Sequence, residues 1–524
     1  MATSSWRPTV VKNRWRERFD GSLPPDWTPT RSVSIVIPVH DTPTLPLTLA
    51  SIAAQDYPEQ LIEVIVVDDG SREPLDLGPV VPPNLRVVRV EGAEWGRSHA
   101  AHVGALAATG DILYWVDADM VLFRDNVREH AKWSHFIPEA ATIGSKGFVA
   151  DWSYTPEDVH RRVRDGSISD AHRDAGEHWI EEVFRRTDDL NASDGRNYST
   201  FTGASASVPR DLYERAGGLD PALKLGEDTE LAYRLWQAGA VFIPARDARS
   251  WHLGASTMQK AGELVKHVND VSFAQRMPIP RYRRRGADHV WQVPFLHVVI
   301  EADEANADYA RTCADRVLAS TLRDVHISMV GPWASLGDGR RRILEDPQLE
   351  LRLTEEWFRS DPRVRLVEEV PPSVFPAPYR LDLPARMGLA VDSLDRLLRR
   401  IDESRVASIE VHAPSGGHRA VLRDSAAVAR ARGAEASWLE WLAEHWGAEI
   451  VTADDVGVDL LTADDLDASI DRTSPRLAEL QAKVGWLRDR AERAEAALAA
   501  VGAARPRSLR ERVAGRLRRM RPVR

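Results

Sequence analysis

The sequence predicts an α/β protein built on a parallel sheet, and two patterns carry this prediction. Apolar, β-branched runs typical of buried strands recur at residues 33–41, 63–71 and 112–116. Apolar residues with helical spacing separate the first two runs: Leu45, Leu49, Ile52 and Ala53. Strand, helix and strand in this order form a βαβ unit, so the two strands should be parallel neighbours.

Acidic residues stand at the end of each predicted strand. Residues i and i+2 of an extended chain point the same way, so Asp117 and Asp119 should face one spot. Ligands of such sheets bind beyond the carboxyl ends of the strands, where Asp41, Asp68 and Asp69 also lie. Clustered carboxylates need a cation or a hydrogen-bonding ligand, and oxygen ligands suit Mg²⁺ or Mn²⁺. Taken alone, Asp-x-Asp is more often a solvated turn.

Six motifs in order give the chain a family resemblance. They are Ser-Ile-Val-Ile-Pro-Val (34–39), Val-Val-Asp-Asp-Gly-Ser (66–71), Val-Asp-Ala-Asp (116–119), Gly-Gly-Leu-Asp (217–220), Gly-Glu-Asp (226–228) and Trp-His-Leu-Gly (251–254). With these motifs, residues 31 to about 260 resemble an inverting glycosyltransferase of family 2 with a GT-A fold. The resemblance implies a hexosyltransferase-type enzyme with a nucleotide-diphosphate sugar donor, a bound Mn²⁺ or Mg²⁺, and single displacement at the anomeric carbon.

The resemblance also implies roles for single residues. Asp119 matches the direct metal ligand and Asp117 the acid on the ribose and metal side. His252 is expected to complete the metal site, because an imidazole beside carboxylates suits Mn²⁺. The positions expected to hold the nucleotide sugar are Pro38, Val39, His40, Asp41, Asp68, Asp69, Arg97, Asp117 and Ala118. Which of Asp68 and Asp69 contacts the base stays open.

One segment departs from the family. The usual Ala-Arg-Asn reads Ala-Ala-His at residues 100–102, so the expected arginine is missing. Arg97 stands nearby and could face the diphosphate, since arginine pairs with phosphate oxygens. The alternative for Arg97 is an ordinary solvated side chain.

Catalysis and acceptor binding are assigned to a second group of residues. Asp228 matches the general base, and a carboxylate that takes a hydroxyl proton lowers the barrier. Glu227 is expected to orient the acceptor or brace the loop, although acids at a helix start are also favourable through capping. Gly203 and Ala204 resemble the acceptor-side turn. Trp179, in the insertion at 150–200, could stack on a sugar, or the insertion is a surface excursion.

Composition fits this interpretation. The chain has 524 residues, 43% of them hydrophobic and 28% charged, which suggests about three or four domains. The net charge of −10 argues against nucleic-acid binding. A single cysteine, Cys313, fits a reducing cytoplasm. The sequence offers no apolar run for a signal peptide or a membrane span, so we expect a cytoplasmic location.

A second α/β pattern follows a linker at 276–287. Its expected strands include 296–302, 325–331 and 408–413, and it resembles a degenerate GT-A-like domain spanning 288–470. At the expected place of Asp-x-Asp it carries Ala-Pro-Ser, residues 413–415. An unrelated α/β domain is the alternative, because weak internal repeats deceive easily. The remaining expected segments are an N-terminal arm at 1–30 and a transferase domain at 31–275.

The last residues differ again in pattern. A heptad seam predicts a coiled-coil helix at 474–503 and hence a homo-oligomer, with packing on the body as the alternative. The Arg-rich amphipathic tail at 504–524 predicts peripheral contact with the inner face of the membrane. The predicted acceptor is a glycan or lipid-linked glycan. The alternatives are a polyprenyl phosphate or small acceptor, or an inactive scaffold that organises a glycan-assembly partner.

Overall fold

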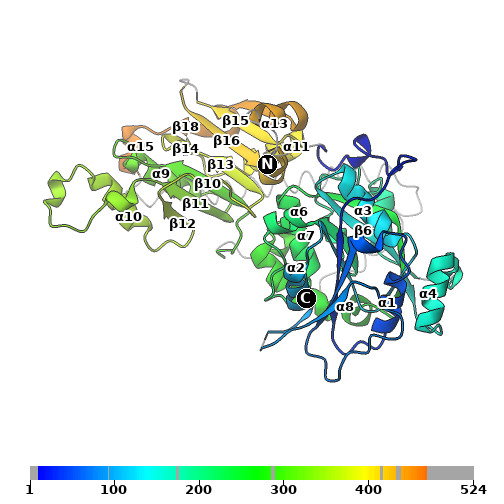
Figure 1. Ribbon diagram of the computed structural model, residues 1–524. Coiled ribbons are helices and arrows are strands. Elements are labelled where there is room, and N and C mark those ends of the chain that lie inside the picture. The colour runs from blue at the N-terminus through cyan, green and yellow to red at the C-terminus, as the bar shows by residue number, and fades with distance from the viewer. Residues whose placement is uncertain are drawn as a thin grey trace, which may run out of the picture.

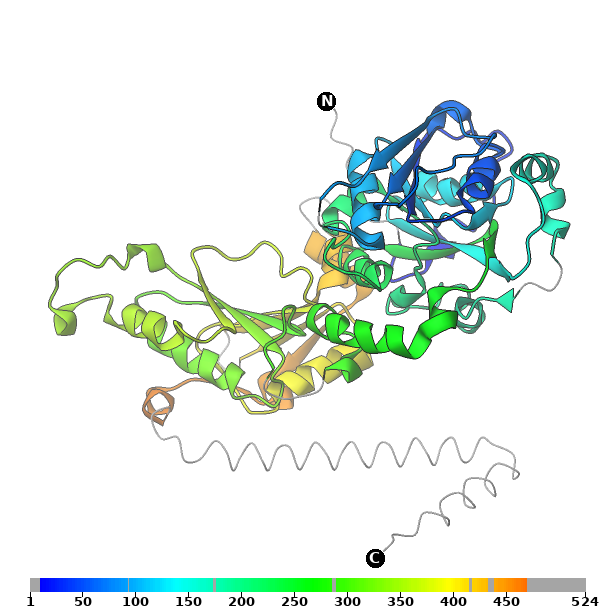
Figure 2. The same cartoon turned by 90° about the horizontal axis from the view of Figure 1, so that it is seen from below.

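The chain is described by a computed structural model of residues 10–468, except for residues 93, 173–175, 285–288, 414–416 and 432–437. It contains two large β-sheets, each flanked by helices, which lie side by side, and a small two-stranded sheet (Figures 1 and 2). The α/β class predicted from the sequence is therefore confirmed. The predicted coiled coil and Arg-rich tail lie outside the described residues. Within the described part, no helix has the length and apolar character needed to cross a membrane.

The first sheet combines a parallel half with an antiparallel half. Its order is β3-β2-β1-β4-β8-β6-β9-β5, and the strands from β3 to β4 run parallel. The strands are β1 (Val33–Val39), β2 (Ile62–Asp68), β3 (Leu85–Arg89), β4 (Ile112–Val116), β5 (Met120–Leu122), β6 (Ala140–Val149), β8 (Ser205–Pro209) and β9 (Val241–Leu253). The order places the ends of β1, β2 and β4 at one edge.

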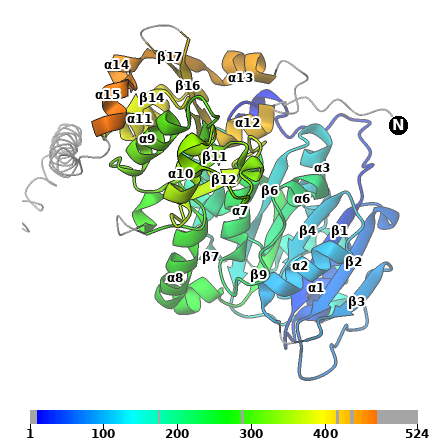
Figure 3. The ribbon, with the colours of Figure 1, turned by 90° about the vertical axis from the view of Figure 1, so that its left-hand side faces the viewer.

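Helices cover both faces of this sheet (Figure 3). They are α1 (Leu45–Ile52), α2 (Arg97–Ala107), α3 (Asn126–Phe136), α6 (Arg210–Arg215), α7 (Glu227–Gln237) and α8 (Thr257–Arg276). Helix α2 approaches closely because Gly104 has no side chain; a Cβ there would clash with Val36. The insertion adds α4 (Pro156–Asp165) and α5 (Ile180–Arg186).

The second sheet repeats the first in strand order and direction. Its order is β12-β11-β10-β13-β16-β15-β17, with the first four strands parallel and β16 antiparallel to both neighbours. A separate small ladder, β14 with β18, corresponds to β5 with β9. The strands are β10 (Leu296–Glu301), β11 (Val325–Val330), β12 (Val364–Val367), β13 (Tyr379–Asp382), β14 (Met387–Leu389), β15 (Ser408–His412), β16 (Arg419–Asp424), β17 (Ala448–Thr452) and β18 (Val458–Leu460).

One helix of the first domain has no described counterpart in the second. Where α2 precedes β4, the second domain has only a loop, residues 368–378, before β13. The helices that are described are α9 (Ala307–Leu318), α10 (Leu349–Phe358), α11 (Ser393–Ser404), α12 (Ser425–Ala431), α13 (Trp438–Trp446), α14 (Ala453–Val456) and α15 (Ala463–Ala468). On the sheet face that lacks this helix, Arg380 on β13 lies opposite Arg423 on β16. These positions correspond to Leu113 and Val208, which share an apolar cluster with residues of α2.

Specific contacts join the two domains. The Arg430 side chain on α12 is buried and donates to carbonyl oxygens of the first domain, including Gly239 at 2.9 Å. The Tyr233 hydroxyl on α7 donates to the Pro376 carbonyl at 2.7 Å. Near the N-terminus, Trp15 is 3% exposed and packs edge-on against Trp133. The described parts of the two domains therefore form a continuous packed body.

Candidate active site

Three of the predicted metal ligands meet at one edge of the first sheet. Asp117 and Asp119 follow β4, and Met120 pairs with His252 on β9, so the antiparallel ladder sets the imidazole beside Asp119. One ligand atom from each of Asp117, Asp119 and His252 lies within 4.8 Å of the others. His252 Nε2 is 3.8 Å from Asp119 Oδ1. The sheet therefore builds a compact group of two carboxylates and one imidazole.

The chemistry of this trio fits a divalent cation. Among the described residues, the buried atoms Asp119 Oδ1 and His252 Nδ1 have no hydrogen-bond partner. Burial raises the pKa of Asp119, and the charge on Asp117 adds to the increase. A cation bound by these groups would offset both effects, because it stabilises the charged carboxylates. Oxygen and nitrogen donors of this kind suit Mn²⁺ or Mg²⁺.

Arg97 occupies the centre of the site. Its guanidinium donates to Asp117 Oδ1 from Nε at 3.0 Å and from Nη2 at 2.7 Å, and it also pairs with Glu227. Burial raises the pKa of Asp117, but Arg97 outweighs it and holds that pKa below its usual range. Arg97 is therefore not a solvated side chain, and it links the end of β4 to the start of α7.

The two acids at the start of α7 have different surroundings. Glu227 is 5% exposed, and burial raises its pKa although Arg97 works against this. Asp228 accepts hydrogen bonds from the backbone nitrogens of Gly203 at 3.1 Å and Thr229 at 2.7 Å. Gly203 also lies against Arg97, since a Cβ on Gly203 would come within 2.6 Å of the guanidinium. The turn with Gly203 and Ala204 therefore adjoins both Asp228 and Arg97.

The residues expected on the nucleotide side lie at the ends of β1 and β2. Asp68 is 3% exposed, pairs with Arg89 at 2.7 Å and accepts from the Ser71 nitrogen at 2.8 Å. Asp69 accepts from the Gly96 nitrogen at 2.7 Å through Oδ2, while its buried Oδ1 has no partner among the described residues. The remaining expected residues of this group at the end of β1 are Pro38, Val39, His40 and Asp41.

The side chains of His40, Asp41 and Ala118 lie as follows. His40 is largely exposed, and its Nδ1 lies 3.0 Å from the Asp69 carbonyl oxygen. Asp41 has a positive φ of 48° and pairs with Arg72 at 3.2 Å. Ala118 is buried and stands between Asp117 and Asp119, which form the metal trio together with His252. The Ala118 carbonyl accepts from Thr44 Oγ1 at 3.0 Å. The expected nucleotide residues thus line one edge together with the metal trio.

Sequence reasoning missed Lys146. This lysine on β6 is 7% exposed and donates from Nζ to Thr202 Oγ1 at 2.6 Å. Burial lowers its pKa to about 8, while Asp117 and Asp228 act in the opposite direction. A lone lysine within the otherwise uncharged run 140–149 was the available signal. Trp179, by contrast, is 53% exposed and contacts His178 with ring centroids 5.7 Å apart.

The second domain carries different residues at the positions of the metal trio. Val33 pairs with both Ile62 and Ile112, and Leu296 pairs with both Val325 and Tyr379. This register sets Pro384 and Arg386 at the places of Asp117 and Asp119. The ladder of β14 with β18 sets Leu460 at the place of His252, because Leu460 pairs with Met387 as His252 pairs with Met120.

This register corrects one expectation from the sequence. The expected counterpart of Asp-x-Asp at 413–415 begins with Ala413, which follows β15, and β15 corresponds to β6 and not to β4; residues 414 and 415 lie outside the described residues. The expected strand at 408–413 is β15, and it follows α11, which corresponds to α3. The second domain therefore lacks the metal trio at its equivalent edge.

Comparisons with known proteins agree on one class. Residues 34–215 match the family described as Glycosyl transferase family 2. The chain is 24% identical to a hyaluronan synthase of Pasteurella multocida over 369 residues, 64% of this chain and 35% of that protein. It is 22% identical to a chondroitin synthase of Escherichia coli over 369 residues, covering 64% and 50%. The chain thus spans between a third and a half of the length of these two relatives.

Two further likenesses are shorter or more distant. An N-acetylglucosaminyltransferase of Bradyrhizobium elkanii is 38% identical over 103 residues, 18% of this chain and 56% of that protein. Among solved structures, a mannosyltransferase of Pyrobaculum calidifontis in complex with GDP-Man and Mn²⁺ is 22% identical. That likeness covers 52% of this chain and 71% of the other, with a TM-score of 0.32.

Proposed function

We propose that the chain is a metal-dependent, inverting glycosyltransferase, because residues 34–215 of its α/β fold match the family described as Glycosyl transferase family 2. It would move a sugar from a nucleotide-diphosphate donor to a hydroxyl of a glycan or lipid-linked glycan. One observation carries the proposal: Arg97 bridges Asp117 of the metal trio to Glu227, the residue beside the candidate base. Donor-side and acceptor-side groups thus meet in one place.

The metal trio would hold the cofactor. Asp117, Asp119 and His252 supply the ligands for Mn²⁺ or Mg²⁺, whose charge would offset the negative charge on the departing diphosphate. When a donor enters, the Arg97 guanidinium is close enough to exchange part of its pairing with Asp117 for phosphate oxygens. Arg97 would then substitute for the arginine that the chain lacks at residues 100–102.

Asp228 would serve as the general base. In the proposed step, the acceptor oxygen bonds to the anomeric carbon while the bond from that carbon to the diphosphate oxygen breaks. The acceptor proton passes to Asp228, and the configuration at the anomeric carbon inverts. Backbone nitrogens of Gly203 and Thr229 hold the Asp228 carboxylate in place, which supports this role. Glu227 is held by Arg97 and would brace the loop.

Asp69 is the better candidate for contact with the base. The Asp68 carboxylate already pairs with Arg89 and accepts from the Ser71 nitrogen. The buried Asp69 Oδ1 has no partner among the described residues, and such an atom favours a ligand that donates a hydrogen bond. The exposed His40 ring, which contacts the Asp69 carbonyl, would stack on the base.

The second domain would take no part in the chemistry. Its equivalent edge carries Pro384, Arg386 and Leu460, and none of these can replace a carboxylate or imidazole ligand. Arg386 adds a positive charge where the first domain would bind a cation, and its guanidinium stacks on the Tyr309 ring at 4.1 Å. The second domain would therefore bind the acceptor or brace the first domain.

A donor panel tests the proposed function. We would measure binding and hydrolysis of UDP-, GDP- and TDP-sugars with and without Mn²⁺, on the wild type and on Asp119→Ala. Asp338→Ala, on an exposed loop of the second domain, is the matched control. Metal-dependent turnover of one donor that is lost only in Asp119→Ala would support the proposal. Failure of every donor to bind in a metal-dependent way would contradict it.

A further inference from the structure

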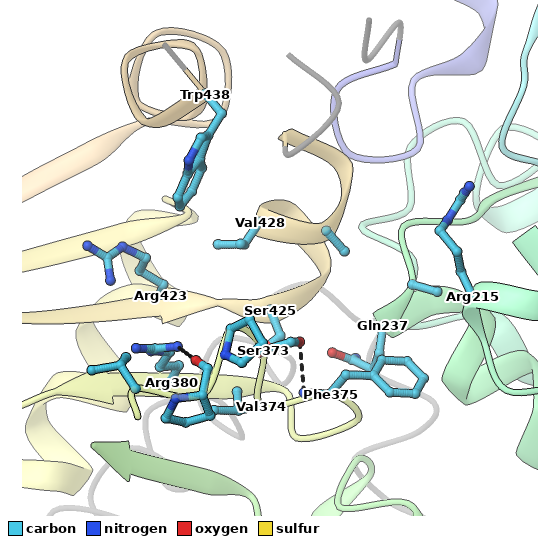
Figure 4. Close-up of a pocket in the computed structure, with 15 residues that line it drawn as sticks. Arg215, Gln237, Ser373, Val374, Phe375, Arg380, Arg423, Ser425, Val428 and Trp438 are labelled. Atoms are coloured by element: carbon cyan, nitrogen blue, oxygen red, sulfur yellow. Dashed lines mark hydrogen bonds between the residues drawn. The ribbon is translucent and has the colours of Figure 1, made fainter. Parts of the chain in front are cut away.

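A pocket of 620 Å³ lies between the two domains, away from the metal trio (Figure 4). The first domain contributes the ends of α6 and α7, with Arg215 and Gln237. The second contributes β13, β16, α12 and the loop that stands where α2 would be. Its size falls within the range of about 300–1,000 Å³ typical of ligand pockets, which are frequent at domain interfaces.

The pocket follows from the missing helix. In the first domain, α2 packs on β1 and β2, and its small side chains share one apolar cluster with Leu113 and Val208. In the second domain, the corresponding Arg380 and Arg423 face a loop that contributes Val374 and Phe375. A loop fills less volume than a helix, so a hollow remains, and helices α6 and α7 of the first domain border it. The pocket is therefore built into the way the two domains pack.

Buried polar groups at the pocket lack partners. Gln237 is 2% exposed, and neither its Nε2 nor its Oε1 makes a hydrogen bond within the described residues. The shielded Ser425 hydroxyl likewise has none. Figure 4 shows Gln237 and Ser425 on the same side of the pocket as Ser373, an exposed residue whose hydroxyl accepts from the Phe375 nitrogen. An unpaired buried amide costs free energy, so these groups are suited to a ligand that both donates and accepts.

The other walls select the shape and charge of such a ligand. Figure 4 shows Val428 and Trp438 opposite the polar side, and Phe375 adds a further aromatic wall. No carboxylate is found among the described residues that line the pocket. The guanidinium groups of Arg380 and Arg423 share the carboxylate of Asp382, and Arg215 pairs with Asp211, so each guanidinium at the pocket already has a carboxylate partner. The ligand should therefore be uncharged, with apolar faces for the aromatic walls and polar groups along its edge.

We propose that this pocket binds a sugar residue of the acceptor glycan. A pyranose ring has the required chemistry, because its C–H faces pack on aromatic rings and its hydroxyls both donate and accept. Gln237 ends the helix whose first turn carries Asp228, so the pocket lies about 14 Å along α7 from the candidate base. The pocket would hold a sugar remote from the reacting hydroxyl. The choice of a glycan rests on the proposed function.

Binding of uncharged oligosaccharides, without donor or metal, tests the pocket. Short oligomers of glucose, galactose, mannose, N-acetylglucosamine and N-acetylgalactosamine would be titrated by saturation-transfer NMR onto the full chain. The variants are Gln237→Met, which keeps the side-chain length, and Trp438→Ala; exposed Gln292→Met is the matched control. We expect at least one oligomer to bind wild type and Gln292→Met alike, and at least tenfold weaker binding by Gln237→Met and Trp438→Ala.

The Tm of Gln237→Met distinguishes a loss of sugar recognition from a loss of structure. Gln237→Met removes an unpaired buried amide, so its Tm should equal or exceed that of the wild type while sugar binding is lost. Asp119→Asn should bind the sugar normally, so a failure of the transferase proposal would not be mistaken for failure here. The proposal is overturned if no oligomer binds, if Gln237→Met binds as well as wild type, or if nucleoside monophosphates displace the sugar.

Discussion

Asp119 and Arg386 occupy the same position in the two sheets of this chain. Asp119 lies between β4 and β5, and Arg386 lies between β13 and β14. Strands β4 and β13 pair with the first strand of their own domain, and β5 and β14 each begin with methionine. The carboxylate lies together with half-buried Asp117 and buried His252, whereas the guanidinium stacks on Tyr309. The same position in the fold thus has a negatively charged carboxylate in the first domain and a positively charged guanidinium in the second.

Loss of the Asp119 carboxylate should abolish the stabilisation of the protein by added Mn²⁺. In Asp119→Asn we expect Mn²⁺ to raise the Tm no longer, because a cation stabilises a protein only in proportion to its binding. Without metal, the variant should be at least as stable as the wild type, since burial and Asp117 disfavour the charged Asp119. Thermal unfolding with and without Mn²⁺ measures both effects, and Arg386→Asn is the matched control. An unchanged Mn²⁺ shift in Asp119→Asn would contradict the assignment.

Removal of Arg97 should destabilise the protein. Arg97→Ala would leave Glu227, whose side chain is 7% exposed, without its partner. A buried carboxylate that loses its partner is costly, and we expect a loss of about 1–3 kcal/mol in the free energy of unfolding. Urea denaturation at neutral pH measures this loss. Arg72→Ala, an exposed arginine paired with Asp41, should change stability by less than about 0.5 kcal/mol.

The sequence was sufficient to predict that Asp117, Asp119 and His252 lie together, but not which residues surround them. Acids after apolar strands mark one sheet edge, because parallel strands end together, and this logic located Asp117 and Asp119. The pairing of Arg97 with Glu227 links residues 130 positions apart, and no local pattern records such a contact. Lys146 was missed for a similar reason, since a lysine in a strand usually points to solvent.

The misplaced counterpart in the second domain has a different cause. The sequence comparison matched helices in order along the chain, but the second domain has no described equivalent of α2. The counterpart of β4 was therefore placed at β15, although strand pairing places it at β13. Pro384 and Arg386 could not be recognised from the sequence as the counterparts of Asp117 and Asp119, because neither is an acid. Strand pairing fixes this register, and pairing is a tertiary property that apolar periodicity does not encode.

Asp228→Asn should slow turnover without weakening donor binding. The amide keeps the shape of the carboxylate but cannot take the acceptor proton, so we expect kcat to fall about 10²- to 10⁴-fold. Donor affinity should stay within about twofold, because Asp228 lies on the acceptor side, bonded to Gly203. Steady-state kinetics and donor titration measure the two quantities. Exposed Asp211→Asn is the control, and a comparable loss of donor affinity would argue against the role of base.

Glu139 should make stability depend on pH. This residue is fully buried at the domain interface, and neither carboxylate oxygen has a hydrogen-bond partner among the described residues. Burial raises its pKa from 4.5 to about 7, against the opposing charge of Arg430. The folded state therefore binds more protons than the unfolded state between these two values. Its stabilising contribution is complete below pH 4.5 and is lost as the pH rises through about 7.

Substitution by glutamine isolates this effect. Glu139→Gln cannot ionise, so relative to the wild type it should gain about 1–3 kcal/mol in the free energy of unfolding between pH 5 and pH 8. Denaturant unfolding of both proteins at the two pH values measures the gain. Exposed Glu73→Gln should show no such gain. A pH-independent difference between Glu139→Gln and wild type would mean that Glu139 keeps its charge at the interface, balanced by Arg430.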